Sequence, residues 1–399
     1  MRAPLSPLIP GIAAIALVLS ACAAGSPSSD VAASSDATAS SDAAASSEGE
    51  AAVAAPAGPL VTVALEEPYA PSAQGTSTDD YRCFLLATDT VDDRFITGVR
   101  FSPGNPQIVH HAILYRVDPS QVEAAQQRDA EDEGQGWTCF GGPDLPSPPG
   151  DDAGVASLDS APWLAAWAPG GKESRYPEGT GVFLPAGSSV ILQVHYNLLA
   201  GDGVDETEVS LRTVPGTEPL RALETMLLPA PVELPCEPGE SGALCDRREA
   251  VADTVERFGG ESLRTIWGLQ FLCGGDLVEP KSGSTQSCRH AVNEDLTLYA
   301  AAGHMHLLGR TIRIVANPGT ADEVTVLDVT NWDFDRQGAI PLPEPLPLKA
   351  GDTLEVTCTH DAGLRSQLPA LADTEPRYIT WGEGTTDEMC LGILTVAPA

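Results

Sequence analysis

Short runs of apolar and β-branched residues, separated by turn residues, follow one another along the chain from residue 59 to its end. The 38 glycines and 34 prolines of the sequence punctuate these runs. Runs of this length between turn residues predict strands that pair in antiparallel sheets. We therefore expect an all-β protein, with strands near residues 94–103, 109–117, 188–199, 208–214, 297–309, 310–316, 323–329 and 352–358.

Helical periodicity is nearly absent from this part of the chain. Only residues 119–133 and 246–259 have a pattern that predicts a helix. Residues 134–181 are mostly Gly, Pro and Asp and predict a long ordered loop. A boundary near residues 213–220 would divide the chain into two β-sandwich domains, which we place at residues 59–215 and 216–399 with a short linker between them.

The N-terminus has the layout of an export signal. One arginine precedes an apolar run from Ile9 to Leu19, which is too short to cross a bilayer, and small residues follow it. The ending LSAC resembles the lipobox of bacterial lipoproteins, which implies removal of residues 1–21 and acylation of Cys22. We therefore expect an exported, membrane-anchored bacterial lipoprotein, on the periplasmic side of an outer membrane or at the cell surface. An ordinary signal peptide with an incidental cysteine is the alternative.

Residues 22–58 are nearly all Ala, Ser, Asp and Pro, in a six-residue polar repeat. Such a segment cannot bury a core, so we expect a disordered tether with a reach of roughly 30 Å. The net charge of the chain is −34, which argues against nucleic acid or an anionic membrane surface as a partner. The tether would leave the lipid anchor as the only contact with a membrane.

Nine cysteines occur in the sequence, and eight remain once Cys22 is set aside. An even number in an exported chain, with no C-x-x-C pair among them, predicts disulfides rather than zinc sites. Their spacing fixes no pairing, although Cys83 with Cys139 is an attractive pair within the first domain.

His195 lies in the apolar run VILQVHYN. Alternation along a strand puts the aliphatic residues and Tyr196 on one face, and His195 on the other with Gln193 and Asn197. A histidine on such a stripe needs a partner, which can be water, a carboxylate or a metal. Considered alone, His195 favours a structural role.

The segment GHMHLLGR is more specific. His304 and His306 are two residues apart in an apolar run, so on a strand both project to one side, close enough to bind one ion. Met305 then points to the other side, which is typical of a core methionine and prevents it from joining its neighbours on a metal.

His110 and His111 pose the reverse problem, because adjacent residues on a regular strand point to opposite faces. Both could bind one ion only if the strand bulges, twists strongly or ends at this point. The turn SPGNP, which ends at Pro106, makes such an irregularity plausible.

Met389 precedes Cys390, and a disulfide at Cys390 would hold it in a fixed position. Imidazole is a good ligand for copper, and a thioether favours Cu(I). Two histidines and one methionine therefore describe a copper site that can hold Cu(I). Three histidines describe a second site that could cycle between Cu(I) and Cu(II).

Four motifs occur here in the order VHHAILYRV, LQVHYN, GHMHLLGR and TTDEMC. Together they resemble the copper type II ascorbate-dependent monooxygenases, which include peptidylglycine α-hydroxylating monooxygenase and dopamine β-monooxygenase. The resemblance covers about residues 80–397. It implies two antiparallel β-sandwich domains of jelly-roll type, two copper ions, and ascorbate as the reductant.

The resemblance also assigns roles to individual residues. The ligands that it implies are His110, His111 and His195 for the first copper, and His304, His306 and Met389 for the second. The second copper would bind O2 beside the substrate C–H bond, and the first would store an electron and pass it across the cleft between the domains. The same resemblance implies that Cys358 pairs with Cys390.

The sequence departs from the peptide-amidating branch of that family. That branch binds its substrate carboxylate with an arginine, an asparagine and a tyrosine, whose positions here are occupied by Ala302, Leu391 and Ile393. The protein therefore lacks the groups that would bind the carboxylate of a glycine-extended peptide. This argues against peptide amidation and favours a more apolar small molecule as the substrate.

Other features carry no predicted chemistry. The segment 331–338, NWDFDRQG, is interpreted as an ordinary turn, and His290 and His360 as surface or structural residues. Our prediction is a lipid-tethered dicopper monooxygenase that acts on a small organic molecule with O2. The alternatives are a non-catalytic copper-binding lipoprotein for sequestration or delivery, and a structural β-sandwich adhesin.

Overall fold

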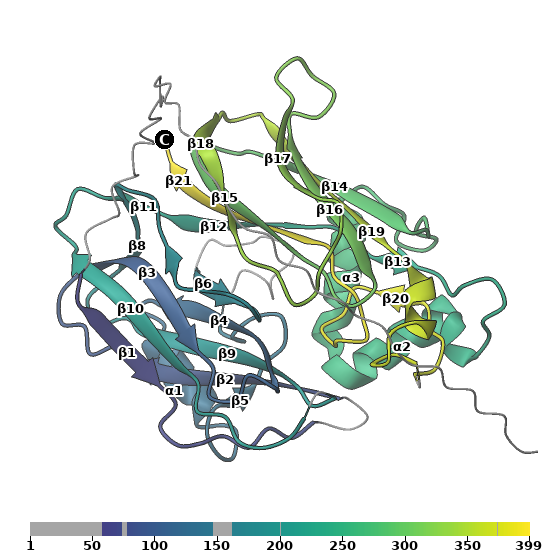
Figure 1. Ribbon diagram of the computed structural model, residues 1–399, viewed down its shortest axis with the longest axis horizontal. Coiled ribbons are helices and arrows are strands. Elements are labelled where there is room, and N and C mark those ends of the chain that lie inside the picture. Colours follow the sequence, from purple (N-terminus) through teal and green to yellow (C-terminus); the bar gives the residue numbers. More distant parts are fainter. Residues whose placement is uncertain (1–57, 74–77, 147–161, 200, 373) are drawn as a thin grey trace, which may run out of the picture. The chain divides into compact units, whose positions relative to one another are not determined.

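The computed structural model describes residues 58–73, 78–146, 162–199, 201–372 and 374–399. In the first half of the chain one sheet has the strand order β5-β2-β9-β4-β6 and a second has the order β1-β10-β3-β8-β11, with β7 beside β3 (Figure 1). The strands are β1 Leu60–Ala64, β2 Asp79–Ala87, β3 Arg94–Ser102, β4 Val109–Val117, β5 Trp137–Thr138, β6 Trp163–Trp167, β7 Ser174–Arg175, β8 Thr180–Leu184, β9 Ser189–Asn197, β10 Glu208–Pro215 and β11 Arg221–Ala222.

The second half repeats this plan. One four-stranded sheet has the order β12-β21-β15-β18, another has the order β14-β19-β16-β17, and β13 pairs with β20 (Figure 1). All of these pairs are antiparallel, which confirms the predicted fold class. The strands are β12 Glu224–Pro229, β13 Glu233–Leu234, β14 Thr285–Ala291, β15 Leu296–His304, β16 Gly309–Ala316, β17 Val324–Val329, β18 Ile340–Leu348, β19 Thr353–His360, β20 Ile379–Thr380 and β21 Leu391–Pro398.

The sheet that contains β4 and β9 is buried on both faces. Alternate residues of β9, such as Leu192 and Val194, belong to the core between the two sheets of the first half. Ile191 lies on the other face, in a core cluster that also contains Leu228 of the second half. His195 has the same parity as Ile191, so the strand directs it toward the region where the two halves meet.

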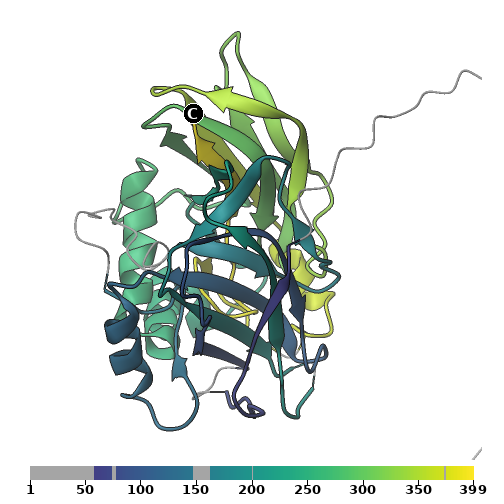
Figure 2. The same cartoon turned by 90° about the vertical axis from the view of Figure 1, so that its left-hand side faces the viewer.

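The helices are α1 Val122–Asp129, α2 Arg247–Phe258 and α3 Gly260–Leu272, with the short 3₁₀ segments η1 Ala243–Cys245 and η2 Ala362–Ser366. The first two fall within the predicted helical segments. Helix α2 begins after Asp246, whose side chain accepts hydrogen bonds from the amides of Arg248 and Glu249. It ends at Gly259, whose φ of 83° suits glycine, and α3 packs against it (Figure 2).

Two expectations about local structure were wrong. Helix α3 was not predicted, because apolar residues occur all round it: Ile266 is buried, whereas Trp267 is 51% exposed, and this blurs the helical period. The segment 134–181 is not loop throughout. Its apolar run Trp163–Trp167 forms β6, which pairs with β4 and so extends the sheet of the histidines.

Eight cysteines form four disulfides, as their even number predicted. The pairs are Cys83–Cys139, Cys236–Cys245, Cys273–Cys288 and Cys358–Cys390. The last of these joins β19 to the residue that follows Met389, so the neighbour of that methionine is fixed covalently to a central strand.

The signal peptide, Cys22 and most of the tether lie outside the described residues. Among the residues that the structure describes, no helix is long and apolar enough to cross a membrane. These residues belong to one compact unit, in which a single core cluster contains side chains of both halves. The domain boundary between residues 215 and 216 therefore stays a prediction.

Candidate metal centre

Three imidazole nitrogens converge at the face of the β4–β9 sheet. The Nδ1 atom of His110 lies 3.2 Å from Nδ1 of His111 and 3.2 Å from Nδ1 of His195. The Nδ1 atoms of His111 and His195 are 3.3 Å apart. This is the histidine cluster among the described residues whose ligand atoms could hold a metal ion.

A β-bulge explains how two adjacent histidines reach one point. The register between β4 and β9 pairs Val109 with Tyr196 and His111 with His195, so His110 is an extra residue without a partner on β9. A bulge re-aims the side chain at the extra position. The irregularity that the sequence required at His110 and His111 is therefore present.

Asp79 determines which nitrogen of His195 is free. Its Oδ1 atom lies 2.8 Å from Nε2 of His195, and both side chains are buried. A carboxylate accepts a hydrogen bond, so Nε2 carries the proton and Nδ1 presents its lone pair to the other histidines. Burial alone would raise the pKa of Asp79, but the hydrogen bonds from His195 and Thr385 outweigh it, and the pKa lies below its ordinary value.

The three nitrogens fit a copper ion. A point equidistant from them lies about 1.9 Å from each, close to the roughly 2.0 Å of metal–imidazole bonds. Burial holds the pKa of His110 and His111 well below its usual range, so both rings are neutral. Neutral imidazoles whose Nδ1 atoms meet at one point are a donor set that suits copper.

Replacing Asp79 with asparagine is expected to weaken copper binding at these three histidines by about 10- to 100-fold, the usual effect of losing a carboxylate behind a metal-binding histidine. An amide oxygen binds the Nε2–H less strongly than a carboxylate does, so the tautomer is less well fixed. A copper titration measures the change. Asp80→Asn is the matched control, because the side chain of Asp80 accepts from Tyr69 and Ser72 instead. Equal losses in the two variants would contradict the role of Asp79.

The second pair of histidines lies at the end of β15. His304 is its last residue, and His306 follows it with a ring centroid 5.2 Å away. Met305 is fully buried in the core, as its position between them predicted. Burial, followed by the charge of His306, lowers the pKa of His304 to about 3, and burial also lowers the pKa of His306.

Hydrogen bonds leave Nε2 of both rings free. Nδ1 of His304 lies 2.6 Å from Oε1 of Gln337, and Nδ1 of His306 lies 3.2 Å from the carbonyl oxygen of Asp387. The amide nitrogen of Gln337 donates to the carbonyl oxygen of Phe334, which fixes the orientation of the amide group. Both Nδ1 atoms therefore donate, and both Nε2 atoms carry lone pairs. Nε2 of His306 is buried with no hydrogen-bond partner, as expected of a metal ligand.

Met389 is placed by the carboxylate before it. The side chain of Glu388 is fully buried and accepts from the backbone amides of His306 at 2.9 Å, Leu308 at 2.5 Å and Met389 at 3.3 Å. One side chain thus ties the methionine segment to the segment of the second histidine pair. The role of Met389 as a metal ligand stays a prediction, as do those of the five histidines.

The segment 331–338 contains the predicted turn, but its side chains also contact both groups of histidines. Besides Gln337, it contributes Trp332, whose Nε1–H donates to the carbonyl oxygen of His306, and Phe334, whose ring stacks on His110 at 4.1 Å between centroids. A side chain at Gly309 would lie 2.8 Å from the Trp332 ring, so this glycine makes room for it. Alternation of the half-buried Trp332 and Phe334 with exposed aspartates was the available signal.

The two groups of histidines lie close together. The ring centroids of His111 and His304 are 5.5 Å apart. The segment 383–388 contacts the surroundings of both groups: Thr385 donates to Asp79 at 2.7 Å, and the Asp387 carbonyl accepts from His306. The structure thus brings the five predicted histidines into one region between the two halves.

The three positions that differ from the peptide-amidating branch lie side by side. Ala302 pairs with Ile393 across β15 and β21, and His304 pairs with Leu391. Paired residues share a face of the sheet, and so do residues two apart. Ala302, Leu391 and Ile393 therefore lie on the same face of the sheet as His304, and Ala302 and Leu391 are buried there.

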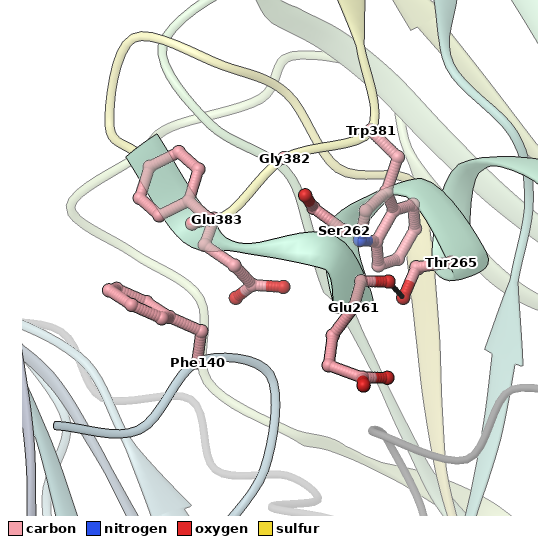
Figure 3. A pocket seen from close by; sticks show the side chains of 8 residues that line it. Phe140, Glu261, Ser262, Thr265, Trp381, Gly382 and Glu383 are labelled. Carbon is pink, nitrogen blue, oxygen red and sulfur yellow. Dashed lines mark hydrogen bonds between the residues drawn. The ribbon is translucent and has the colours of Figure 1, made fainter. Parts of the chain in front are cut away.

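Glu383 points into a small pocket (Figure 3). The pocket has a volume of about 20 Å³ and is lined by Phe140 and Trp381, among others. The backbone oxygen of Glu383 accepts a hydrogen bond from Tyr81, whose ring stacks on His195. Burial, and next the charge of Asp387, raise the pKa of the Glu383 carboxyl to about 7.

This raised pKa predicts a pH-dependent stability. Because the folded protein binds the proton of Glu383 more tightly than the unfolded chain does, the stabilisation is complete below about pH 4.5 and is lost as the pH rises through about 7. Glu383→Gln cannot ionise, so its melting temperature should exceed that of the wild type at pH 8 but not at pH 4. Glu261→Gln, at an exposed position of the same pocket, is the control. Identical melting curves of Glu383→Gln and wild type at pH 8 would contradict the prediction.

Comparison with known proteins agrees with the motifs. A model of the N-terminal domain of copper type II ascorbate-dependent monooxygenases matches residues 69–202, and a model of their C-terminal domain matches residues 279–396. Among solved structures, allantoicase is 11% identical, with a TM-score of 0.19, over 74% of this chain and 79% of its own. The T13 viral particle of IBDV is 7% identical, with a TM-score of 0.18, over 86% and 72%. TM-scores this low do not indicate a shared fold or function.

Proposed function

Because the chain belongs to the copper type II ascorbate-dependent monooxygenase family, we propose that it hydroxylates a C–H bond of a small organic substrate, using O2 and an external reductant. The family binds two copper ions and uses ascorbate as its reductant. In this chain we assign one ion to the Nδ1 atoms of His110, His111 and His195. We assign the other to Nε2 of His304, Nε2 of His306 and the thioether of Met389.

The main support for the proposal is the presence of two groups of imidazole nitrogens that could each bind one copper ion. Three Nδ1 atoms converge at one group, and hydrogen bonds on Nδ1 leave Nε2 free at the other. Copper at these positions would supply the one-electron chemistry that couples reduction of O2 to insertion of one oxygen atom into the C–H bond. The reaction consumes two electrons from the reductant and releases water.

The protein groups prepare the region for this chemistry. Asp79 and Gln337 hold the rings of His195 and His304 in one tautomer, so the donors do not reorganise when the metal changes its charge. Phe334 packs over His110 and keeps water from that ring. Buried neutral histidines carry no proton that would compete with the metal.

The substrate that fits best is apolar near its reacting carbon. The residues that share the face of His304 are Ala302, Leu391 and Ile393, none of which can bind a carboxylate. A glycine-extended peptide would leave its carboxylate without a partner there, which is costly in a buried site. We therefore propose that peptide amidation is not the reaction.

We further propose that the enzyme acts outside the cytoplasm as a lipoprotein. The sequence of Cys22 and the residues before it supports acylation at that cysteine. Residues 22–58 would tether the enzyme to the membrane.

The test is substrate-stimulated turnover. Copper-loaded protein, O2 and ascorbate are incubated with apolar small molecules and, in parallel, with a glycine-extended peptide. We expect faster O2 consumption and a hydroxylated product with at least one apolar compound and no stimulation by the peptide. Stimulation by the peptide alone would overturn the substrate assignment. Tight copper binding with no stimulation across a broad screen would favour sequestration.

A further inference from the structure

His360 is a buried histidine that the proposed reaction does not use. It is the last residue of β19 and is 2% exposed. Its Nε2 atom lies 3.1 Å from the carbonyl oxygen of Met389 and 3.3 Å from Oε2 of Glu388. Both neighbours are acceptors, so Nε2 carries a proton and donates to them.

Strand β19 holds two consecutive residues of the methionine segment, Met389 and Cys390. Alternate residues of this strand are buried, so Cys358 and His360 lie on the same face. Cys358 is bonded to Cys390, and His360 holds the carbonyl of Met389. The disulfide fixes the residue after the methionine, and the hydrogen bond fixes the plane of the peptide bond between them.

The same ring also orients the carboxylate of Glu388. That carboxylate accepts from the amides of His306 and Met389 through Oε2, the oxygen next to His360. A change in the orientation of Glu388 would therefore shift Met389 relative to His306. His360 is thus in contact with both groups that set the position of Met389.

This matters because a methionine side chain is long, flexible and a weak ligand. With three rotatable bonds, its sulfur stays near a metal only if its backbone is held in place. We infer that His360 is a positioning residue for Met389, which keeps the thioether available to the second copper. The inference rests on the proposed function, because it assumes that Met389 binds copper.

The test compares three variants of the full chain loaded with Cu(I). His360→Phe keeps the ring and removes the donor, and His360→Gln keeps an amide donor. His290→Phe is the matched control, because Nε2 of His290 also lies within hydrogen-bond distance of a backbone carbonyl, that of Pro229, at 2.9 Å. X-ray absorption reports the sulfur ligand, a competitive titration reports Cu(I) affinity, and EPR of the oxidised protein reports the three-histidine site.

We expect His360→Phe to lose the sulfur contribution and to bind Cu(I) at the second site at least tenfold more weakly. His360→Gln should recover part of both, and His290→Phe should match the wild type. EPR of the three-histidine site should be unchanged in every variant. If His360→Phe does not fold, His360→Gln tests the inference instead. Its affinity for Cu(I) should lie between that of the wild type and that of a variant without Met389.

Retention of the sulfur ligand and of full Cu(I) affinity in His360→Phe would overturn the inference. Parallel losses at both sites would also overturn it, because they indicate a role in folding rather than in positioning. Absence of sulfur scattering in the wild-type protein would instead refute the assignment of Met389 in the proposed function, and the inference with it.

Discussion

Replacing His304 with alanine is expected to abolish the substrate-dependent consumption of O2. The ring supplies one of two Nε2 donors at the second group, and Gln337 holds it in the tautomer that binds metal. Alanine leaves His306 and Met389 as the remaining donors, a pair too small to retain copper tightly. We expect a fall in substrate-stimulated turnover on the order of 100-fold or more, measured as O2 and ascorbate consumption with and without substrate.

In His304→Ala, copper should be lost from the second site only. The EPR signal of the three-histidine site should persist in His304→Ala, because its donors belong to β4 and β9. His290→Ala is the matched control, since this histidine lies on β14 and its Nε2 atom lies 2.9 Å from the Pro229 carbonyl oxygen. Normal turnover in His304→Ala, or equal loss of copper at both sites, would contradict the ligand assignment.

Replacing Met389 with isoleucine is expected to weaken Cu(I) retention at the second site and to leave the first unchanged. Isoleucine fills a similar volume in the core but has no sulfur. Because a thioether favours Cu(I), the affinity for Cu(I) should fall more than the affinity for Cu(II). We expect a decrease of at least about tenfold for Cu(I), measured by competition with a Cu(I) chelator.

Met305→Leu provides the control for this substitution. Met305 stands between the two histidines in the sequence, but it is fully buried in the core. Its loss should reduce stability modestly and leave Cu(I) affinity unchanged at both sites. If Met305→Leu weakens Cu(I) binding as much as Met389→Ile does, the ligand is not Met389.

Strands were predictable from the sequence where one face of a strand is apolar and turn residues bound it. Strand β9 is an example, because alternation alone separates Leu192 from His195. Helix α3 escaped prediction because Trp267 and Phe271 are apolar but exposed, so the sequence has no polar face at their positions. Strand β6 escaped because it is short and lies within a segment of loop composition.

The candidate ligands were predictable for a chemical reason. Histidine is rare in this chain, and five of its seven histidines form compact groups in apolar runs. The requirement for a bulge at His110 followed from the geometry of a strand, and the register of β4 with β9 contains one. These are local properties, and the periodicity and spacing of residues in the sequence are enough to predict them.

The groups that orient the ligands were not predictable in this way. Asp79 lies 116 residues from His195, and Gln337 lies 33 residues from His304. Nothing in the composition of either segment distinguishes a hydrogen bond to a histidine from a solvated polar surface. Only the fold shows that the segment 331–338 reaches both groups of histidines.

Copper content is the most direct test of the central claim, that two sets of donors hold one copper each. The purified full-length protein is loaded with copper, passed over a chelating resin and analysed for metal and protein. We predict two tightly bound copper ions per chain, falling to one in His304→Ala. Fewer than one tightly bound copper per chain in the wild type would contradict the account.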